Sequence, residues 1–255
     1  MPEVLSLILA ACMLVMCAHA ADASPAEHWI TTSKSPCEGL TIGWTPPLAA
    51  LQKVIGQRWE PAKGPVNEHG ILLLFAASCP LSHIGKHVTG PFTIGAVIIA
   101  VQTPKDTHGV KQTNGHGWAV VPEAFGPASG PVMQLFKRHG FAVMDAKVML
   151  DVHKTTKGNQ ANMSFVTAHG RIEVRAFASE QTKRFDYVSA LASTNASVFS
   201  LFTGPESALR QAQGTATVTA QGDTLVSQLG LDATPRIVTL DHDFVWDFKF
   251  SNQPE

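Results

Sequence analysis

The sequence has no excess of charge of either sign and no cluster of basic residues. Its 19 lysines and arginines are balanced by 20 aspartates and glutamates. Binding to a polyanion requires a basic surplus or at least a basic stripe on the surface. The balanced composition therefore excludes nucleic acid from the expected partners.

The sequence also lacks the short motifs that mark common catalytic and cofactor sites. It contains no Gly-x-Ser-x-Gly, no Gly-x-Gly-x-x-Gly, no Walker loop and no Cys-x-x-Cys. These motifs build the nucleophile elbow of serine hydrolases, the dinucleotide and phosphate sites, and many redox sites. No cofactor is expected, and the enzyme classes that depend on these motifs have no support.

One apolar run stands at the start of the chain. Residues 4–18 form an apolar run without a basic residue, and Ala18-His19-Ala20 follows as a small-x-small cleavage pattern, although the usual positive residues before the run are missing. This pattern predicts a secretory signal peptide, residues 1–20, that is cleaved after Ala20, so the mature protein is exported, periplasmic or extracellular. The alternative is a membrane anchor, which needs about 20 apolar residues, and Glu3 and His19 leave the run shorter than that. No transmembrane segment is expected after processing.

Cysteine is scarce, with four residues in the chain. Cys12 and Cys17 belong to the leader, so only Cys37 and Cys79 remain in the mature protein. Two thiols in an exported chain are expected to form one disulfide, with two buried free thiols as the alternative. A lipoprotein anchor at Cys17 is disfavoured because the bulky Met16 precedes it.

The mature chain divides into an irregular segment and a β-rich domain. Prolines recur within residues 21–46, which predicts irregular structure there. Residues 47–255 contain no linker rich in glycine, serine or proline, no charge block and no internal repeat. They are expected to form a single β-rich domain with ample material for a core.

Apolar patterning predicts strands along most of this domain. The runs ILLLFAAS from Ile71 and FTIGAVIIAV from Phe92 are short, continuous and partly β-branched, which favours buried central strands. Further strands are expected at HGWAVV, ANMSFVTA, RIEVRAFAS, FDYVSA, SVFSLFT, GTATVTA and RIVTL, and short helices at PLAALQKVIG, GPVMQLFKRHG, PESALRQA and GDTLVSQLG. The expected fold class is mainly β, or β-rich α+β: a curved antiparallel sheet or partly closed β-barrel with a few short helices.

The C-terminal stretch HDFVWDFKF is expected to be a strand with one aromatic face. Phe244, Trp246 and Phe248 alternate with other residues and so share a side of the strand. An aromatic face of this kind needs to be covered by protein or by a ligand.

The stretch HGFAVMDAKVML, residues 139–150, also alternates like a strand. Ala146 and its mostly small or apolar neighbours two residues apart fall on one face, and Val143, Asp145 and Lys147 fall on the other. The first face is expected to point inward. Asp145 and Lys147 are expected to form a solvated ion pair on the outer side.

This stretch resembles the acetoacetate decarboxylase superfamily, in which Gly-aromatic-Pro-Lys followed by an alternating strand supplies a Schiff-base lysine. Gly140 and Phe141 match the glycine and the aromatic residue, and Ala146 matches an alanine of the strand. The place of the proline is taken by Ala142 and the place of the lysine by Val143. The chain therefore departs from the superfamily pattern at the catalytic residue itself.

The resemblance covers residues 48–152 in the order of elements, and it implies a related fold without the usual lysine. Val143 cannot form an imine. An imine-forming amine must be unprotonated near neutral pH, whereas Asp145 on the same face would stabilise the ammonium form of Lys147. A structural role in solvent is the favoured interpretation of Lys147, and catalysis by Lys147 is the alternative.

His83 and His87 stand four residues apart, a spacing that on a helix would place both imidazoles on one face for a metal ion. Pro80 and Gly85 make a helix unfavourable here. A third ligand would have to come from elsewhere, among His69, His108 and His116. No metal is expected, and the favoured interpretation is a polar loop in solvent or beside a ligand site.

Asn162 and Asn195 each begin an Asn-x-Ser triplet, the pattern of N-glycosylation acceptors. Such triplets are frequent by chance. They are expected to mark surface positions.

These observations favour an exported protein that binds a small apolar or amphipathic molecule without a covalent catalytic residue. The candidate ligand-binding residues are Phe92, Val143, Phe244, Trp246 and Phe248. The alternatives are a decarboxylase-like lyase with non-standard catalytic residues, namely Lys147 or the two histidines His83 and His87, and a cell-envelope interaction module.

Overall fold

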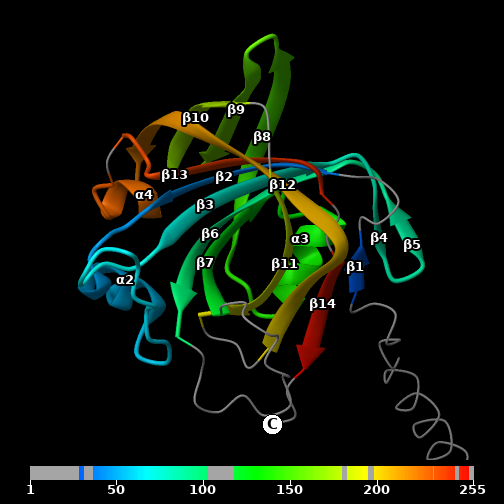
Figure 1. The fold of residues 1–255 in the computed structure, drawn as a ribbon. Coiled ribbons are helices and arrows are strands. Elements are labelled where there is room, and N and C mark those ends of the chain that lie inside the picture. Colours follow the sequence, from blue (N-terminus) through cyan, green and yellow to red (C-terminus); the bar gives the residue numbers. More distant parts are fainter. Residues whose placement is uncertain are drawn as a thin grey trace, which may run out of the picture.

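A computed structural model of the chain describes residues 29–31, 37–102, 118–179, 183–194, 198–231, 233–244 and 247–252. The strands join in one large, strongly curved mixed sheet, and short helices lie against it (Figure 1). The strands are β1 (Trp29–Thr31), β2 (Cys37–Trp44), β3 (Leu72–Cys79), β4 (Ser82–Ile84), β5 (His87–Thr89), β6 (Phe92–Val101), β7 (Trp118–Gly126), β8 (Val143–Thr155), β9 (Gly158–Thr167), β10 (Gly170–Ala178), β11 (Lys183–Ser193), β12 (Val198–Gly222), β13 (Ile237–Phe244) and β14 (Asp247–Asn252). The described helices are α2 (Leu48–Ile55), α3 (Pro131–Arg138) and α4 (Leu225–Gln228).

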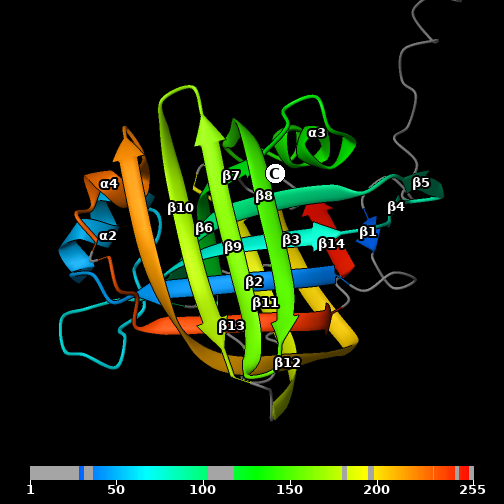
Figure 2. The same ribbon diagram turned by 90° about the horizontal axis from the view of Figure 1, so that it is seen from above.

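The sheet forms two layers that cross each other. β6, β3, β2 and β13 lie side by side in a central layer, and β8, β9, β10 and the C-terminal part of β12 form an outer layer across them (Figure 2). β12 belongs to both layers, because its residues 210–213 pair with β13 and its residues 214–222 pair with β10. The predicted β-rich α+β fold with a curved sheet is confirmed.

Two ladders differ from the antiparallel arrangement that the sequence suggested. β7 pairs in parallel with β8 and also with β11. Parallel neighbours need a crossover connection, and α3 supplies it between β7 and β8. The sequence pattern indicated this helix but did not indicate that it connects parallel strands.

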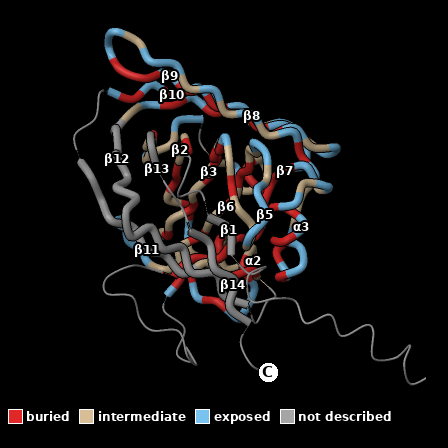
Figure 3. Tube along the Cα trace, turned by 90° about the vertical axis from the view of Figure 1, so that its right-hand side faces the viewer, coloured by how far each residue is buried: buried red, intermediate tan, exposed pale blue. Residues whose placement is uncertain are grey.

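The main hydrophobic core fills the space between the two layers. The central layer contributes Leu40, Leu74 and Ile99, and the outer layer contributes Met163 and Phe165, all of them buried. Burial alternates along the outer strands, with one side facing the core and the other facing solvent (Figure 3). This alternation is the period of two that the sequence predicted for these strands.

A second hydrophobic cluster, here called the α3 cluster, forms where α3 packs against the strands. Val132, Met133 and Phe136 of α3 meet Ala77 of β3 and Ala124 of β7 in this cluster. The central sheet is therefore covered on both faces, by the outer layer on one and by α3 on the other. Strands buried on both faces read as continuous apolar runs, as the sequence of β3 and β6 does.

Local capping signals account for the helix ends. Thr224 accepts a hydrogen bond from the backbone N–H of Ser227 at 3.1 Å and so caps α4. Gly230 follows α4 with a φ of 58°, and Gly56 ends α2 with a φ of 72°. Among the described residues, no helix is long and apolar enough to cross a membrane.

Three sequence assignments differ from the structure. Residues 21–46 were expected to be irregular, but they contain β2, which lies at the centre of the sheet between β3 and β13. Residues 205–212 were expected to be helical and instead belong to β12. The stretch 242–250 was expected to be one strand and is divided between β13 and β14. In all three segments the observed structure depends on pairing with strands that are distant in sequence, and this pairing overrides the local propensity.

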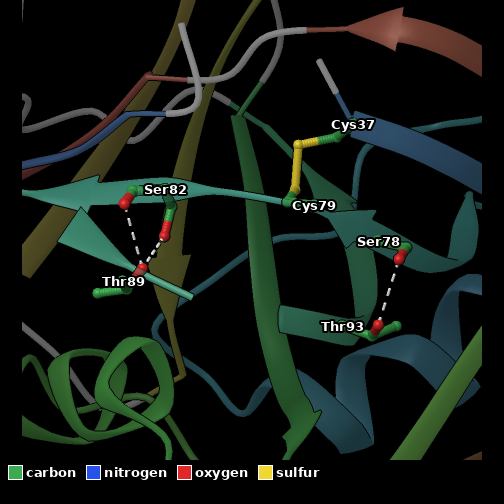
Figure 4. Close-up of a disulfide and its surroundings, with 6 residues drawn as sticks. All are labelled: Cys37, Ser78, Cys79, Ser82, Thr89 and Thr93. Carbon is green, nitrogen blue, oxygen red and sulfur yellow. Dashed lines mark hydrogen bonds between the residues drawn. A yellow bond between two sulfur atoms is a disulfide. The ribbon is translucent and has the colours of Figure 1, made fainter. Parts of the chain in front are cut away.

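Cys37 and Cys79 form the predicted disulfide (Figure 4). It links the first residue of β2 to the last residue of β3, with 4.4 Å between the two Cα atoms. Beside it, Thr93 donates a hydrogen bond from its hydroxyl to the hydroxyl of Ser78 at 3.3 Å, across the ladder between β6 and β3. The bridge therefore closes one end of the central layer, next to the start of β6.

Candidate functional site

A groove of about 520 Å³ opens beside α3. It lies where the sheet changes partners: β6 pairs with β3 from Phe92 onward, but with β7 only from Gly95 onward. Its walls are the loop that enters β6, the first turn of α3 and residues 145–148 of β8. We call it the α3–β8 groove.

The floor of the α3–β8 groove is mostly apolar. Phe92 and Ile94 of β6, Val132 and Met133 of α3, and Val148 of β8 line it. Three of these side chains are almost fully buried because they also belong to the α3 cluster. The floor is therefore a fixed surface, and it suits the hydrocarbon part of a small ligand.

Asp145 and Lys147 supply the charged side chains of the groove wall. Asp145 does not pair with Lys147 as expected; its Oδ1 accepts a hydrogen bond from the backbone N–H of Ala128 at 2.9 Å. It thereby holds the loop that precedes α3. Lys147 is exposed and makes no ion pair within the described part of the chain. Its ammonium group is available to an anionic group of a ligand.

The first turn of α3 adds partial positive charge to the groove. Pro131, Val132 and Met133 line the groove, and no side chain caps the start of this helix. The N–H groups of a helix's first turn lack partners within the helix, and the helix dipole makes this end positive. Together with Lys147, it favours a ligand that carries a carboxylate.

The structure brings only part of the predicted ligand-binding set to this groove. Phe92 lines it, whereas Val143 is partly buried and packs against the α3 cluster. Phe244 is the last residue of β13, and Phe248 lies in β14. Trp246 lies outside the described residues. Binding by Val143, Phe244, Trp246 and Phe248 stays a prediction.

The predicted histidine pair lies on a hairpin, not on a helix. In the ladder between β4 and β5, His83 is opposite Val88 and His87 is opposite Ile84. Residues opposite each other point to the same face and adjacent residues point to opposite faces, so His83 and His87 face different sides. The two imidazoles cannot bind one metal ion in this arrangement.

Glu123 is a buried acid that the sequence analysis did not single out. It lies on β7 opposite Val97, a core residue of β6, so its side chain faces the interior between the layers. Burial raises the pKa of the Glu123 carboxyl, and the negative charge of Asp223 raises this pKa further. The signal in the sequence was one acid inside the otherwise apolar run WAVVPEAF.

Replacing Glu123 with glutamine should make stability less dependent on pH. Because the folded protein retains the Glu123 proton at pH values where the unfolded chain has lost it, the free energy of unfolding falls as pH rises from the ordinary glutamate pKa to the higher folded pKa. Glu123→Gln removes this loss, so its Tm should exceed that of the wild type at pH 7 and match it at pH 4. Thermal denaturation at both pH values measures the effect.

The exposed Glu60 provides a control for this comparison. Glu60→Gln should follow the wild-type pH profile. A Glu123→Gln variant that is less stable than the wild type at pH 7 would contradict the assignment of Glu123 as a destabilising buried charge.

Comparison with known proteins identifies the fold. No family model matches the chain, and no curated protein is similar to it in sequence. An acetoacetate decarboxylase-like enzyme from Sphingomonas wittichii RW1 is similar in structure, with a TM-score of 0.62 and 9% identity over 89% of this chain and 91% of that chain. The enduracididine biosynthesis enzyme MppR, in complex with the condensation product of pyruvate and imidazole 4-carboxaldehyde, has a TM-score of 0.56 and 13% identity over 87% of this chain and 86% of that chain. The acetoacetate decarboxylase from Legionella pneumophila has a TM-score of 0.52 and 12% identity over 87% of this chain and 84% of that chain.

The chain therefore has the fold of acetoacetate decarboxylase-like proteins. The resemblance that residues 139–150 suggested is confirmed at the level of the fold. At these identities the likeness carries no catalytic residue from one chain to another, so function has to be argued from the groove.

Proposed function

We propose that the protein is a lyase that acts on a small 3-keto acid bound in the α3–β8 groove. The observation that carries this proposal is Lys147: it lines a groove in a decarboxylase-like fold, and its ammonium has no ionic partner within the described residues. The apolar floor accepts the carbon chain of the keto acid. The uncapped first turn of α3 attracts its carboxylate.

The proposed chemistry uses Lys147 as a nucleophile that is released at the end. Lys147 first loses its ammonium proton to solvent; its Nζ then attacks the ketone carbon of a 3-keto acid, the ketone oxygen leaves as water, and an imine forms. The bond between the carboxylate carbon and its neighbour then breaks, CO₂ leaves, and the electron pair of that bond enters the imine to give an enamine. A proton adds to the enamine carbon, and one water hydrolyses the imine. The products are CO₂ and a ketone, with Lys147 restored.

Borohydride reduction tests this role of Lys147. The wild-type protein should gain the mass of the reduced adduct when it is treated with borohydride in the presence of acetoacetate or another small 3-keto acid, and peptide mapping should place that mass on Lys147. Lys147→Arg keeps the positive charge but cannot form the imine, so it should gain no mass and release no CO₂.

The matched control is Lys157→Arg, which changes an exposed lysine in the turn between β8 and β9. This variant should be labelled as the wild type is. The proposal fails if no keto acid labels the wild type, or if Lys147→Arg and the wild type are labelled equally.

A second candidate function is non-covalent binding of an amphipathic carboxylate. The exposure of Lys147 favours it, because an exposed ammonium is a good counter-ion for a carboxylate at the rim of an apolar floor. This function predicts that Lys147→Arg retains the ligand and Lys147→Met loses it. The lyase instead loses turnover in both variants, so the pair of variants separates the two functions.

We also propose that the protein is exported. The disulfide between Cys37 and Cys79 is compatible with an oxidising compartment. The leader, residues 1–20, lies outside the described residues. N-terminal sequencing of the protein from its own source is the test: a start at Ala21 supports export, and a chain that retains Met1 overturns the predicted cleavage.

A further inference from the structure

The solvent face of the outer layer carries an ordered set of polar side chains around one aromatic ring. Six exposed side chains occupy two neighbouring rows across β9, β10 and β12: Asn162, Arg175 and Thr217 in one row, and Gln160, Phe177 and Thr215 in the next. They line a groove of about 460 Å³. We call it the outer-sheet groove. It lies on a different part of the outer layer from the α3–β8 groove.

The loop between α4 and β13 forms one wall of the outer-sheet groove. Thr234 of this loop lines the groove, and the neighbouring Ala233 carbonyl accepts a hydrogen bond from the N–H of Val218 at 2.8 Å. β10, at the centre of the groove, pairs with β9 on one side and β12 on the other. Its backbone groups are already used in these ladders, so a ligand is recognised by side chains.

Arg175 is a cation whose acidic neighbours are already paired. Glu173, two residues away on the same face of β10, forms an ion pair with Arg171. Asp151, on β8 in the same row, pairs its Oδ2 with Nε2 of His153 at 2.7 Å. Arg175 makes no ion pair within the described part of the chain. Its guanidinium therefore offers a two-pronged donor to an anionic group in the groove.

Phe177 presents an exposed phenyl ring among hydrogen-bonding side chains. It is 37% exposed, on a face where its neighbours across the strands are Gln160 and Thr215. A ring in this position offers a flat apolar surface, and the surrounding amides and hydroxyls both donate and accept hydrogen bonds. A sugar ring combines the matching features, an apolar face of C–H groups and a rim of hydroxyls.

We propose that the outer-sheet groove binds a saccharide that carries a carboxylate, of the hexuronate type. Arg175 pairs with the carboxylate, and Phe177 stacks on the face of the sugar ring. Asn162, Gln160 and the threonines bind the hydroxyls. Arg175 is the cationic side chain among the residues that line the outer-sheet groove, and one positive charge matches the single negative charge of a carboxylate. An extended peptide is a poorer match, because it binds by adding to a strand edge and β10 has none free.

Isothermal titration of the full chain with trigalacturonate tests the proposal, with maltotriose as the neutral probe. Arg175→Gln should weaken trigalacturonate binding about tenfold or more, because it removes a charge-assisted hydrogen bond. Phe177→Ala should weaken it by about tenfold through loss of stacking. Arg138→Gln, the same substitution at the exposed end of α3, is the matched control and should bind as the wild type does.

Each outcome decides for or against the groove. Saturable binding that Arg175→Gln weakens and Arg138→Gln leaves intact supports the proposal. It is overturned if trigalacturonate does not bind, if both arginine variants lose affinity equally, or if maltotriose binds equally well. Thermal melting confirms that each variant is folded. Lys147→Arg should bind trigalacturonate normally, so this site and the proposed lyase site can fail independently.

Discussion

Gly95→Ala should destabilise the protein by about 2 kcal/mol and lower its Tm by about 4–8 °C. A Cβ atom at Gly95 would lie 1.9 Å from Cε1 and 2.7 Å from Cζ of Phe165. Phe165 cannot move away easily, because it is 1% exposed and packs against Phe125 with 5.0 Å between the ring centroids. The substitution therefore overpacks the core between the two layers. Thermal and urea denaturation measure the loss.

Two further variants make this prediction specific. At Gly90 an added Cβ meets no atom within 4 Å, so Gly90→Ala should leave the Tm nearly unchanged. Phe165→Leu shortens the obstructing side chain, so Gly95→Ala should cost clearly less in that background than in the wild type. An equal cost in both backgrounds would show that Phe165 is not the obstacle.

Loss of the disulfide is the second large effect. The bridge spans a sequence separation of 42, and in the chain-entropy model a loop of this size stabilises the folded protein by about 4 kcal/mol. The variant with serine at both Cys37 and Cys79 should therefore melt about 10 °C below the wild type. Differential scanning calorimetry of protein oxidised before purification measures this difference.

Reductant provides the control for the disulfide. Cys37 and Cys79 are 0% and 1% exposed, so reduction requires opening of the fold. Wild-type protein that has been unfolded, reduced and refolded under reducing conditions should melt close to the double-serine variant. Reductant should leave the variant itself unchanged. Equal melting of oxidised wild type and variant would contradict a stabilising bridge.

Many of the strands were predictable because apolar and polar residues alternate along their sequences. β8, β9 and β10 are exposed and buried in turn, and their sequences alternate accordingly. The assignments that differ concern segments whose partners are far away in sequence. Residues 205–212 have a helical pattern, yet they complete a strand that pairs with β11 and β13. Such pairings supply a free energy that a local window does not contain.

The candidate site was predictable only through single residues. Resemblance drew attention to Lys147, and alternation placed it correctly on the exposed face of β8. The groove around it depends on the point where β7 stops pairing with β6, which no local pattern reports. Asp145 was expected to pair with Lys147 but binds the Ala128 N–H instead, because the loop before α3 comes within hydrogen-bonding distance. The raised pKa of Glu123 likewise arises first from burial and then from the negative charge of Asp223, which is far away in sequence.

The position of β2 in the sheet governs when the protein can fold. Its partner β13 spans residues 237–244. Cys37 therefore pairs with Phe244, and Gly43 pairs with Ile237, about 200 residues later in the chain. One edge of β2 has no partner until residues 237–244 are in place, whereas β8, β9 and β10 pair with strands next to them in sequence. Pairings that close such long loops are slow. The ladder between β2 and β13 is therefore expected to form later in folding than the local hairpins of the outer layer.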